Sequence, residues 1–282
     1  EMNGMMRDDA AARCCKYGFI GVGNMASALI AGLIDTGAVK PDNIMVFDID
    51  ASRCTPFTAR GAYAAESAAE VCGSCAYIYL AVKPYQMRDC LAGIKDARFF
   101  DEAILVSIAA SVPTDFIASQ LGREAGVIRV MPSTPMLVGK GASAVTANRF
   151  VPAARLDGFV ADLKKVSVVE VMDESLLNPV ISVNGSSPAY CYLFMKALLE
   201  GAVAQGIKPE IAQPLLLQTI EGAVEMVRRA GKPIDVLIRE VSSPGGTTLA
   251  ALDSFEKSGF VQSVVDAMRA CTTRADEITA EL

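Results

Sequence analysis

The pattern of apolar and polar residues changes near residue 173. Before it, short apolar runs alternate with segments that repeat apolar residues at helical spacing. After it, strand-like alternation nearly disappears and long helical repeats follow one another. Strands that alternate with helices are typical of a doubly wound parallel sheet. The pattern therefore predicts an α/β N-terminal domain and an all-helical C-terminal domain.

The individual elements follow from the same pattern and from the glycine and proline residues between them. We expect strands at residues 17–20, 44–48, 76–82, 103–107, 127–131, 142–146 and 166–171. We expect helices at residues 24–34, 51–60, 66–71 and 152–164, and one that Pro113 opens. In the second region helices are expected at residues 174–183, 188–205, 209–230 and 261–278, with shorter ones between them. The expected organisation is a loose tail (residues 1–16), a first domain (17–172) and a helical domain (173–282).

Several C-terminal helices are apolar on more than one side, for example over residues 190–204. This is more apolar surface than one small bundle can bury. We expect a second copy of the chain to cover it, in a homo-oligomer that is a dimer or larger. The alternative is that these helices pack on the first domain of the same chain.

A glycine turn joins the first strand to the first helix. Gly21 permits the tight turn, Gly23 allows close approach of a pyrophosphate, and Ala26 lets the helix lie against the strand. Free N–H groups at the start of the helix favour an anion. Asp48 ends the second strand, as in dinucleotide-binding sheets. The pattern predicts a Rossmann-like dinucleotide site, and its alternative is an ordinary turn without a ligand.

Composition excludes several classes of function. The chain of 282 residues carries a net charge of −6 and no basic cluster, so nucleic acid is not an expected partner. Apolar runs stay below the ~18 residues that span a bilayer, so no membrane partner is expected either. The first residues resemble neither a signal nor a transit peptide, and we expect a cytoplasmic protein.

Cysteine and histidine usage narrows the chemistry further. The chain has eight cysteines without a disulfide framework, and it has no histidine. Cys72 and Cys75 have the spacing of a redox or zinc pair, but a second pair is missing. We interpret them as structural thiols and expect no metal site. Without histidine, a Ser-His-Asp or Cys-His catalytic pair is impossible.

Six ordered motifs resemble the pyrroline-5-carboxylate reductase family, from Gly18 to near the C-terminus. They lie at residues 19–25, 81–84, 107–110, 129–135, 185–190 and 243–248. The resemblance implies an oxidoreductase that uses NADPH or NADH to reduce L-1-pyrroline-5-carboxylate to L-proline, the last step of proline biosynthesis. It also implies a C-terminal dimerisation domain that interlocks with that of a second subunit and completes the active site.

The resemblance also implies roles for individual residues. The cofactor-binding residues are Ile20, Gly21, Val22, Gly23, Asn24, Met25, Asp48, Ala81, Val82, Lys83, Pro84, Ile108, Ala109 and Ala110. The substrate-binding residues are Ser186, Glu240, Gly245, Gly246, Thr247 and Thr248, and the catalytic residues are Ser243 and Thr248.

The loop at residues 243–248 suits the carboxylate of the substrate on physical grounds as well. Pro244, Gly245 and Gly246 form a tight turn, and Thr247 is expected to cap the next helix. Backbone N–H groups and the helix dipole would favour a carboxylate there. The hydroxyl of Thr248 could reach the nitrogen of the ring. The alternative is a plain capped helix turn.

Two residues depart from the family pattern. Ser133 stands where the family usually has asparagine, and Ser187 where it usually has glycine. Cofactor choice stays open, because Asp48 favours NADH whereas Arg53 lies within plausible reach of a 2′-phosphate.

Rival functions belong to two classes. The first is another imine reductase or a β-hydroxyacid dehydrogenase, which needs a catalytic lysine in its helical domain. Lys196 is the only lysine in the helix predicted at residues 188–205. The second is a dinucleotide-sensing protein without activity, and the intact loop at residues 243–248 argues against it.

Overall fold

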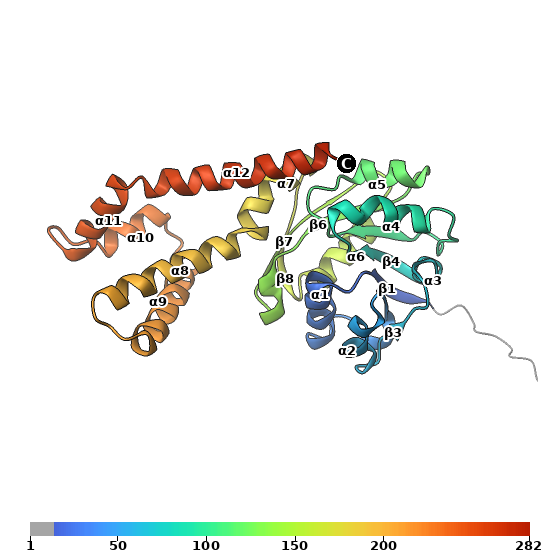
Figure 1. Cartoon of the computed structure of the whole chain (residues 1–282), viewed down its shortest axis with the longest axis horizontal. Coiled ribbons are helices and arrows are strands. Elements are labelled where there is room, and N and C mark those ends of the chain that lie inside the picture. Colours follow the sequence, from blue (N-terminus) through green and yellow to red (C-terminus); the bar gives the residue numbers. More distant parts are fainter. Residues whose placement is uncertain (1–13) are drawn as a thin grey trace, which may run out of the picture. The chain divides into compact units, whose positions relative to one another are not determined.

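A computed structural model describes residues 14–282 of the chain, and these residues form two units (Figure 1). The sheet unit contains the chain up to Ser186 together with Cys271–Leu282, and the helical unit contains Ser187–Ala270. Most of the expected N-terminal tail lies outside the described residues, while Cys15 and Lys16 already belong to the first strand.

The sheet unit is built on an eight-stranded sheet with the order β3-β2-β1-β4-β5-β6-β7-β8. The strands are β1 (Cys15–Ile20), β2 (Ile44–Phe47), β3 (Tyr63–Ala64), β4 (Cys75–Leu80), β5 (Ile104–Ser107), β6 (Val127–Met131), β7 (Gly141–Ala147) and β8 (Ser167–Val171). In the centre, Phe19 of β1 pairs in parallel register with Val46 of β2 and with Tyr79 of β4. The strand order reverses between β1 and β4, which is where such sheets bind their ligands.

The expectation of an all-parallel sheet is wrong for the last two strands. β6 pairs with β7 in antiparallel register, and β7 then pairs in parallel with β8. The connection from β6 to β7 holds only a short 3₁₀ turn, Thr134–Val138. A parallel crossover needs a dozen or more residues, usually with a helix, so this short connection reverses the chain direction.

Helices cover both faces of the sheet. Leu29 of α1 and Phe159 of α6 pack on one face with Tyr17 of β1, whereas Leu91 of α4 and Ile117 of α5 pack on the other. Because successive strand residues face opposite sides, Phe19 and Ile20 belong to different faces and to different core clusters. The helices are α1 (Asn24–Asp35), α2 (Thr55–Thr58), α3 (Ala68–Ser74), α4 (Met87–Ile94), α5 (Thr114–Leu121), α6 (Ala153–Leu163) and α7 (Leu177–Val180).

Local sequence explains where the helices differ from expectation. The helix expected at residues 51–60 is a 3₁₀ turn, Ala51–Arg53, followed by α2, because Pro56 cannot donate the next helical hydrogen bond. The helix expected at 66–71 begins later because Ser67 caps it, its Oγ accepting from the N–H of Glu70 at 3.2 Å. The helix expected at 174–183 includes a π-helical turn, Ile181–Gly185. The helix α4 was not predicted.

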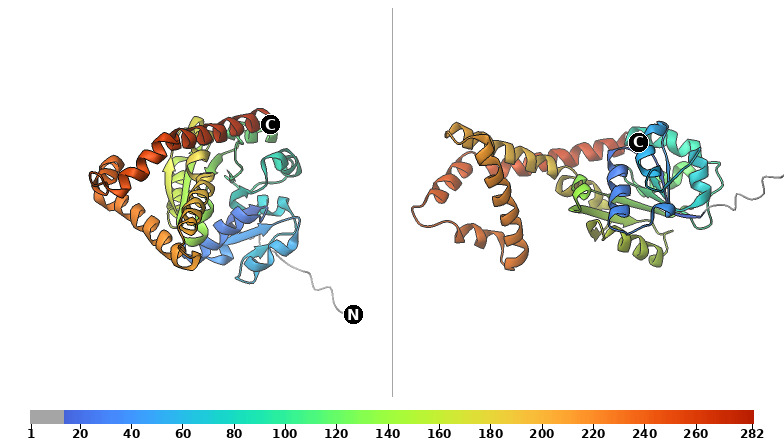
Figure 2. Two further views of the ribbon diagram at one scale, coloured as in Figure 1. Left: turned by 60° about the vertical axis from the view of Figure 1, so that its left-hand side comes forward. Right: turned by 90° about the horizontal axis from the view of Figure 1, so that it is seen from below.

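In the helical unit, α8 packs against α9, and the chain continues through two shorter helices into α12 (Figure 2). Its helices are α8 (Ser187–Ala204), α9 (Pro209–Ala230), α10 (Ile234–Glu240), α11 (Thr247–Lys257) and α12 (Phe260–Ala280), of which the last turns belong to the sheet unit. No helix in residues 14–282 combines the length and the apolar character needed to cross a membrane.

Candidate cofactor and substrate sites

The glycine turn after β1 has the geometry that its sequence predicts. Gly21 has φ +95°, and a Cβ atom on it would lie 2.8 Å from the carbonyl oxygen of Ala81. Both the left-handed backbone and this close approach require glycine. At Gly23 an added Cβ would meet nothing within 4 Å, so the space beside this residue is open. The turn therefore leaves room for a ligand against the backbone of Gly23.

The start of α1 faces this open space with unpaired donors. Gly23 is the N-cap and offers no side chain, so Asn24 and Met25 begin the helix without a side-chain cap. Free N–H groups and the helix dipole make such an end suitable for a phosphate group. Ala26 is buried against the sheet. The small residue at this position allows the close packing that aims the helix end at the ligand.

Two cavities of about 890 and 580 Å³ lie at the carboxyl ends of the central strands. Every residue that the sequence assigns to the cofactor lines at least one of them: Ile20, Gly21, Val22, Gly23, Asn24, Met25, Asp48, Ala81, Val82, Lys83, Pro84, Ile108, Ala109 and Ala110. Lys83 and Arg53 line both cavities. The larger cavity extends to Met131 at the end of β6 and to Pro132 and Thr134 just beyond it. Together the two cavities are large enough for a dinucleotide.

Asp48 joins the second strand to the glycine turn. One carboxylate oxygen accepts from the N–H of Val22 at 2.7 Å, and the other accepts from the N–H of Asp50 at 2.9 Å. A carboxylate has about four acceptor positions, so Asp48 keeps capacity for further donors such as ribose hydroxyls. It therefore stabilises the turn and also presents a negative charge to the smaller cavity.

Arg53 is the cation nearest in sequence to this carboxylate. Its Nε lies 3.5 Å from a carboxylate oxygen of Asp50. Hydrogen bonds from Ser52, followed by the charge of Arg53, lower the pKa of Asp50. Both partners are exposed, so the ion pair is weak, and Arg53 is free to turn towards a phosphate group.

The loop between α10 and α11 carries the residues that the sequence assigns to the substrate. Gly245 has φ +70°, which a tight turn requires. Gly246 donates its N–H to the carbonyl of Ser243 at 3.0 Å. The expectation that Thr247 caps α11 is wrong, because Gly246 is the N-cap and Thr247 is the first helical residue. No side chain in the described part of the chain caps this helix. The first N–H groups of α11 therefore have no side-chain partner, and Thr248, in the same turn, is half-buried.

The other two assigned residues lie outside this loop. Glu240 ends α10 and forms an ion pair with Lys232 in the helical unit. Ser186 belongs to the sheet unit, where its N–H closes the π-helical turn on Ile181 at 2.8 Å. The Oγ of Ser186 accepts from the thiol of Cys271 at 3.4 Å.

Ser133, which departs from the family pattern, has a structural contact. Its side chain is buried, and its hydroxyl accepts from the N–H of Ala142 at 2.8 Å. Cys72 and Cys75 are buried free thiols, and burial raises the pKa of Cys72 to about 12. Among residues 14–282, Cys, Asp and Glu side chains do not gather in any group of three or more that could hold a metal ion.

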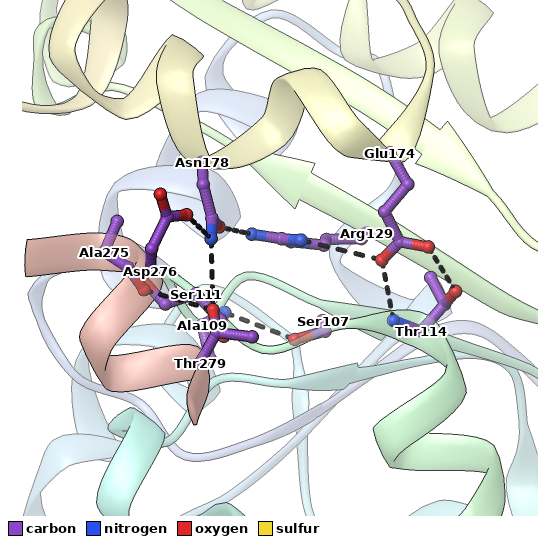
Figure 3. Close-up of polar contacts among 10 residues, drawn as sticks. All are labelled: Ser107, Ala109, Ser111, Thr114, Arg129, Glu174, Asn178, Ala275, Asp276 and Thr279. Atoms are coloured by element: carbon purple, nitrogen blue, oxygen red, sulfur yellow. Dashed lines mark hydrogen bonds and ion pairs between the residues drawn. The ribbon is translucent and has the colours of Figure 1, made fainter. Parts of the chain in front are cut away.

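Sequence reasoning missed a polar network that joins the segment after β5 to β6, α7 and the last turn of α12 (Figure 3). It joins Ser111, Arg129, Glu174, Asn178 and Thr279, which are far apart in the sequence. The only signal was the place of Arg129 in one of the six motifs. Nothing in the sequence connected Arg129 with Thr279.

Comparisons with known proteins agree with this arrangement. Residues 174–278 match the family model described as pyrroline-5-carboxylate reductase dimerisation, and residues 16–111 match NADP oxidoreductase coenzyme F420-dependent. The chain is 36% identical over 265 residues to the pyrroline-5-carboxylate reductase of Escherichia coli, covering 94% of this chain and 98% of the relative. It is 32% identical to that of Arabidopsis thaliana, covering 95% and 97%.

Solved structures that resemble this chain include reductases of the same name. The pyrroline carboxylate reductase of Plasmodium falciparum with NADP bound has a TM-score of 0.87 and 29% identity, covering 94% of this chain and 98% of the other. The Coxiella burnetii pyrroline-5-carboxylate reductase has a TM-score of 0.86 and 30% identity, covering 95% and 99%.

Proposed function

The chain belongs to the pyrroline-5-carboxylate reductase family, and we propose on this basis how its own residues carry out the family's reaction. It is an NAD(P)H-dependent oxidoreductase that reduces L-1-pyrroline-5-carboxylate to L-proline, the last step of proline biosynthesis. The observation that carries the proposal is the free helix end of α1 beside the open space at Gly23, at the switch point of the sheet.

We assign the two cavities of the sheet unit to NADPH or NADH. The N–H groups at the start of α1 would hold the pyrophosphate, and Asp48 and Arg53 would contact the adenosine ribose. Lys83 lines both cavities and can serve a phosphate or a ribose. Ile108, Ala109 and Ala110 line the larger cavity, where they shape the nicotinamide end. When bound, the cofactor supplies the hydride for the C=N bond.

We assign the loop at residues 243–248 to the substrate. The carboxylate of the imine binds the N–H groups that Gly246 leaves uncapped at the start of α11. The hydroxyl of Thr248 hydrogen-bonds the nitrogen of the ring, and Ser243 lies in the same turn. The imine enters protonated, so the protein has to align the two rings and exclude water rather than supply a strong acid. This is chemistry that a chain without histidine can perform.

We place the dinucleotide-binding domain at residues 17–172 and the helical dimerisation and substrate domain at residues 173–282. The chain acts as a homo-oligomer, and its match to the dimerisation model supports this. We propose that the enzyme works in the cytoplasm, as expected for a biosynthetic reductase.

The structure offers no support for a hydroxyacid dehydrogenase. Lys196, the lysine that such an enzyme would need, is exposed and forms an ion pair with Glu200 at 3.6 Å. The discriminating experiment compares two assays: oxidation of NADPH and NADH with L-pyrroline-5-carboxylate, and reduction of NADP⁺ and NAD⁺ with β-hydroxyacids. Turnover with the imine supports the proposal. A folded protein that binds the cofactor but turns over neither substrate would support a dinucleotide-sensing protein instead.

A further inference from the structure

The segment between β5 and α5 contains the cofactor loop, which we define as residues 108–110. The loop is followed by Ser111, whose backbone has φ +66°. A left-handed conformation is unfavourable for a residue with a side chain, so it persists only where surrounding contacts fix it. Ser111 is buried, and its hydroxyl has no partner among residues 14–282. The side chain of Ser111 therefore does not hold the loop, and its backbone has to be held from outside.

The last turn of α12 supplies that contact. The hydroxyl of Thr279 lies 2.7 Å from the carbonyl oxygen of Ser111 and 3.1 Å from that of Ala275 in its own helix. The Nδ2 of Asn178 donates to the same hydroxyl at 3.1 Å. A hydroxyl that accepts from Asn178 keeps its single proton for another acceptor, and the shorter distance favours Ser111. Figure 3 shows Thr279 placed between these groups.

Arg129 fixes the direction of this chain of hydrogen bonds. Its Nη2 donates to Oδ1 of Asn178 at 2.7 Å. Because a guanidinium group can only donate, this contact determines which end of the amide faces Arg129 and which faces Thr279. Arg129 is only 4% exposed, and burial lowers its pKa while Glu174 opposes that shift. The buried side chain of Arg129 therefore holds the amide of Asn178 in this orientation.

The same arginine reaches the far side of the segment. Its Nη1 lies 3.5 Å from Oε1 of Glu174. The carboxylate of Glu174 accepts from the N–H of Thr114 at 2.7 Å and from its hydroxyl at 2.6 Å, at the start of α5. The segment that follows the loop is consequently held at two points, at Ser111 by Thr279 and at Thr114 by Glu174.

We propose that Thr279 is a positioning residue for the cofactor, which acts by holding the backbone of Ser111 and thereby the cofactor loop in its binding conformation. The inference rests on the proposed cofactor site. If only part of the population has the competent loop, the apparent dissociation constant rises by the reciprocal of that fraction. At saturating cofactor concentration the bound population has the competent loop, so kcat is preserved.

The test compares Thr279→Val, which keeps the shape but lacks the hydroxyl, with Thr279→Ser, which restores the hydroxyl. We expect Thr279→Val to raise the Kd and the KM for NADPH about three- to tenfold, the effect of one ordinary hydrogen bond. We expect kcat at saturating NADPH to stay within about twofold of wild type, and Thr279→Ser to recover the wild-type Kd. The Kd is measured by NADPH fluorescence titration without substrate, beside a melting curve.

Thr36→Val is the matched control, because the hydroxyl of Thr36 also bonds the carbonyl four residues earlier, that of Gly32 at 2.8 Å, on an exposed helix end. It should leave the Kd unchanged. If Thr279→Val does not fold, Thr279→Ala carries the test, since alanine favours a helix. A wild-type Kd in the folded variant, or a failure of Thr279→Ser to restore it, overturns the inference alone. A wild-type protein that binds neither NADPH nor NADH overturns the proposed cofactor site as well.

Discussion

At the scale of single residues, Asp48 has two effects that one substitution can separate. Asparagine keeps an acceptor oxygen for the N–H of Val22, but it removes the charge that faces the smaller cavity and gives up the bond from the N–H of Asp50. We expect Asp48→Asn to raise the ratio of kcat/KM for NADPH over NADH by about tenfold, because the 2′-phosphate no longer meets a carboxylate. Arg53→Ala should shift the ratio the other way.

The control for this prediction is Asp42→Asn, which also removes one negative charge. Asp42 precedes the first residue of β2, whereas Asp48 follows its last residue. The control should leave the ratio unchanged. An unchanged ratio in Asp48→Asn as well would mean that Asp48 supports the glycine turn and does not select the cofactor.

Thr248 tests the substrate loop at the same scale. Thr248→Ala removes a hydroxyl and leaves the turn and α11 intact. We expect kcat/KM for the imine to fall by roughly ten- to a hundredfold, because a lost buried hydrogen bond costs about 1–3 kcal/mol. The Kd for NADPH should not change, because the cofactor cavities lie in the sheet unit. Steady-state kinetics and a cofactor titration measure the two effects.

Two further variants serve as the control and as the more damaging change for the Thr248 prediction. Ser258→Ala removes a hydroxyl that bonds the carbonyl of Ser254 at the other end of the same helix, and it should behave as wild type. Gly246→Val should be worse than Thr248→Ala, because a Cβ there would lie 3.0 Å from the carbonyl oxygen of Ser243 and 2.5 Å from its hydroxyl. Wild-type efficiency in Thr248→Ala would reduce this loop to a helix start without a substrate role.

At the scale of elements, Asp162 joins α6 to β1. It accepts from the hydroxyl of Tyr17 at 2.8 Å and forms an ion pair with Lys16. Burial acts to raise the pKa of Asp162, but the hydrogen bonds from Lys16 and Tyr17 and the nearby positive charges outweigh it and lower the pKa. A carboxyl whose pKa is lower in the folded state stabilises the fold above its unfolded pKa of ~3.9, and loses this effect as the pH falls through the folded value.

We therefore expect Asp162→Asn to lower the free energy of unfolding by about 1–3 kcal/mol at pH 7. The difference from wild type should be constant between about pH 5 and 8 and shrink below about pH 4. Urea unfolding at several pH values measures it, with Asp157→Asn on the exposed side of α6 as the control. A difference that does not depend on pH would show that the charge of Asp162 contributes nothing.

Sequence patterns predicted the elements whose causes are local. The glycine turn, the buried strands and the long helices follow from residues that are neighbours in the chain, and the break at Pro56 has a local cause that periodicity alone overlooked. The antiparallel β7 depends on the length of a connection, which the hydrophobic pattern does not show. The contact between Thr279 and Ser111 joins residues 168 positions apart, and only the folded chain brings them together.

At the scale of the whole molecule, apolar side chains on the helical unit point to its assembly. Within this unit, Leu193 of α8, Leu215 of α9 and Val261 of α12 are 68%, 65% and 74% exposed. Exposed apolar surface of this extent is typical of an interface. The family model for dimerisation matches this region. We expect the mass of a dimer or a larger oligomer by light scattering at micromolar concentration, and a monomer mass would contradict the assembly.

The activity itself can be followed atom by atom. Reduction of L-1-pyrroline-5-carboxylate requires that one hydride moves from the C4 position of NADPH or NADH to the carbon of the C=N bond. The direct measurement is mass spectrometry and NMR of the product formed with cofactor deuterated at C4 on the transferred face. The account predicts L-proline with a single deuterium at C5, the former imine carbon. Oxidation of neither cofactor, or proline without deuterium from either face, would contradict it.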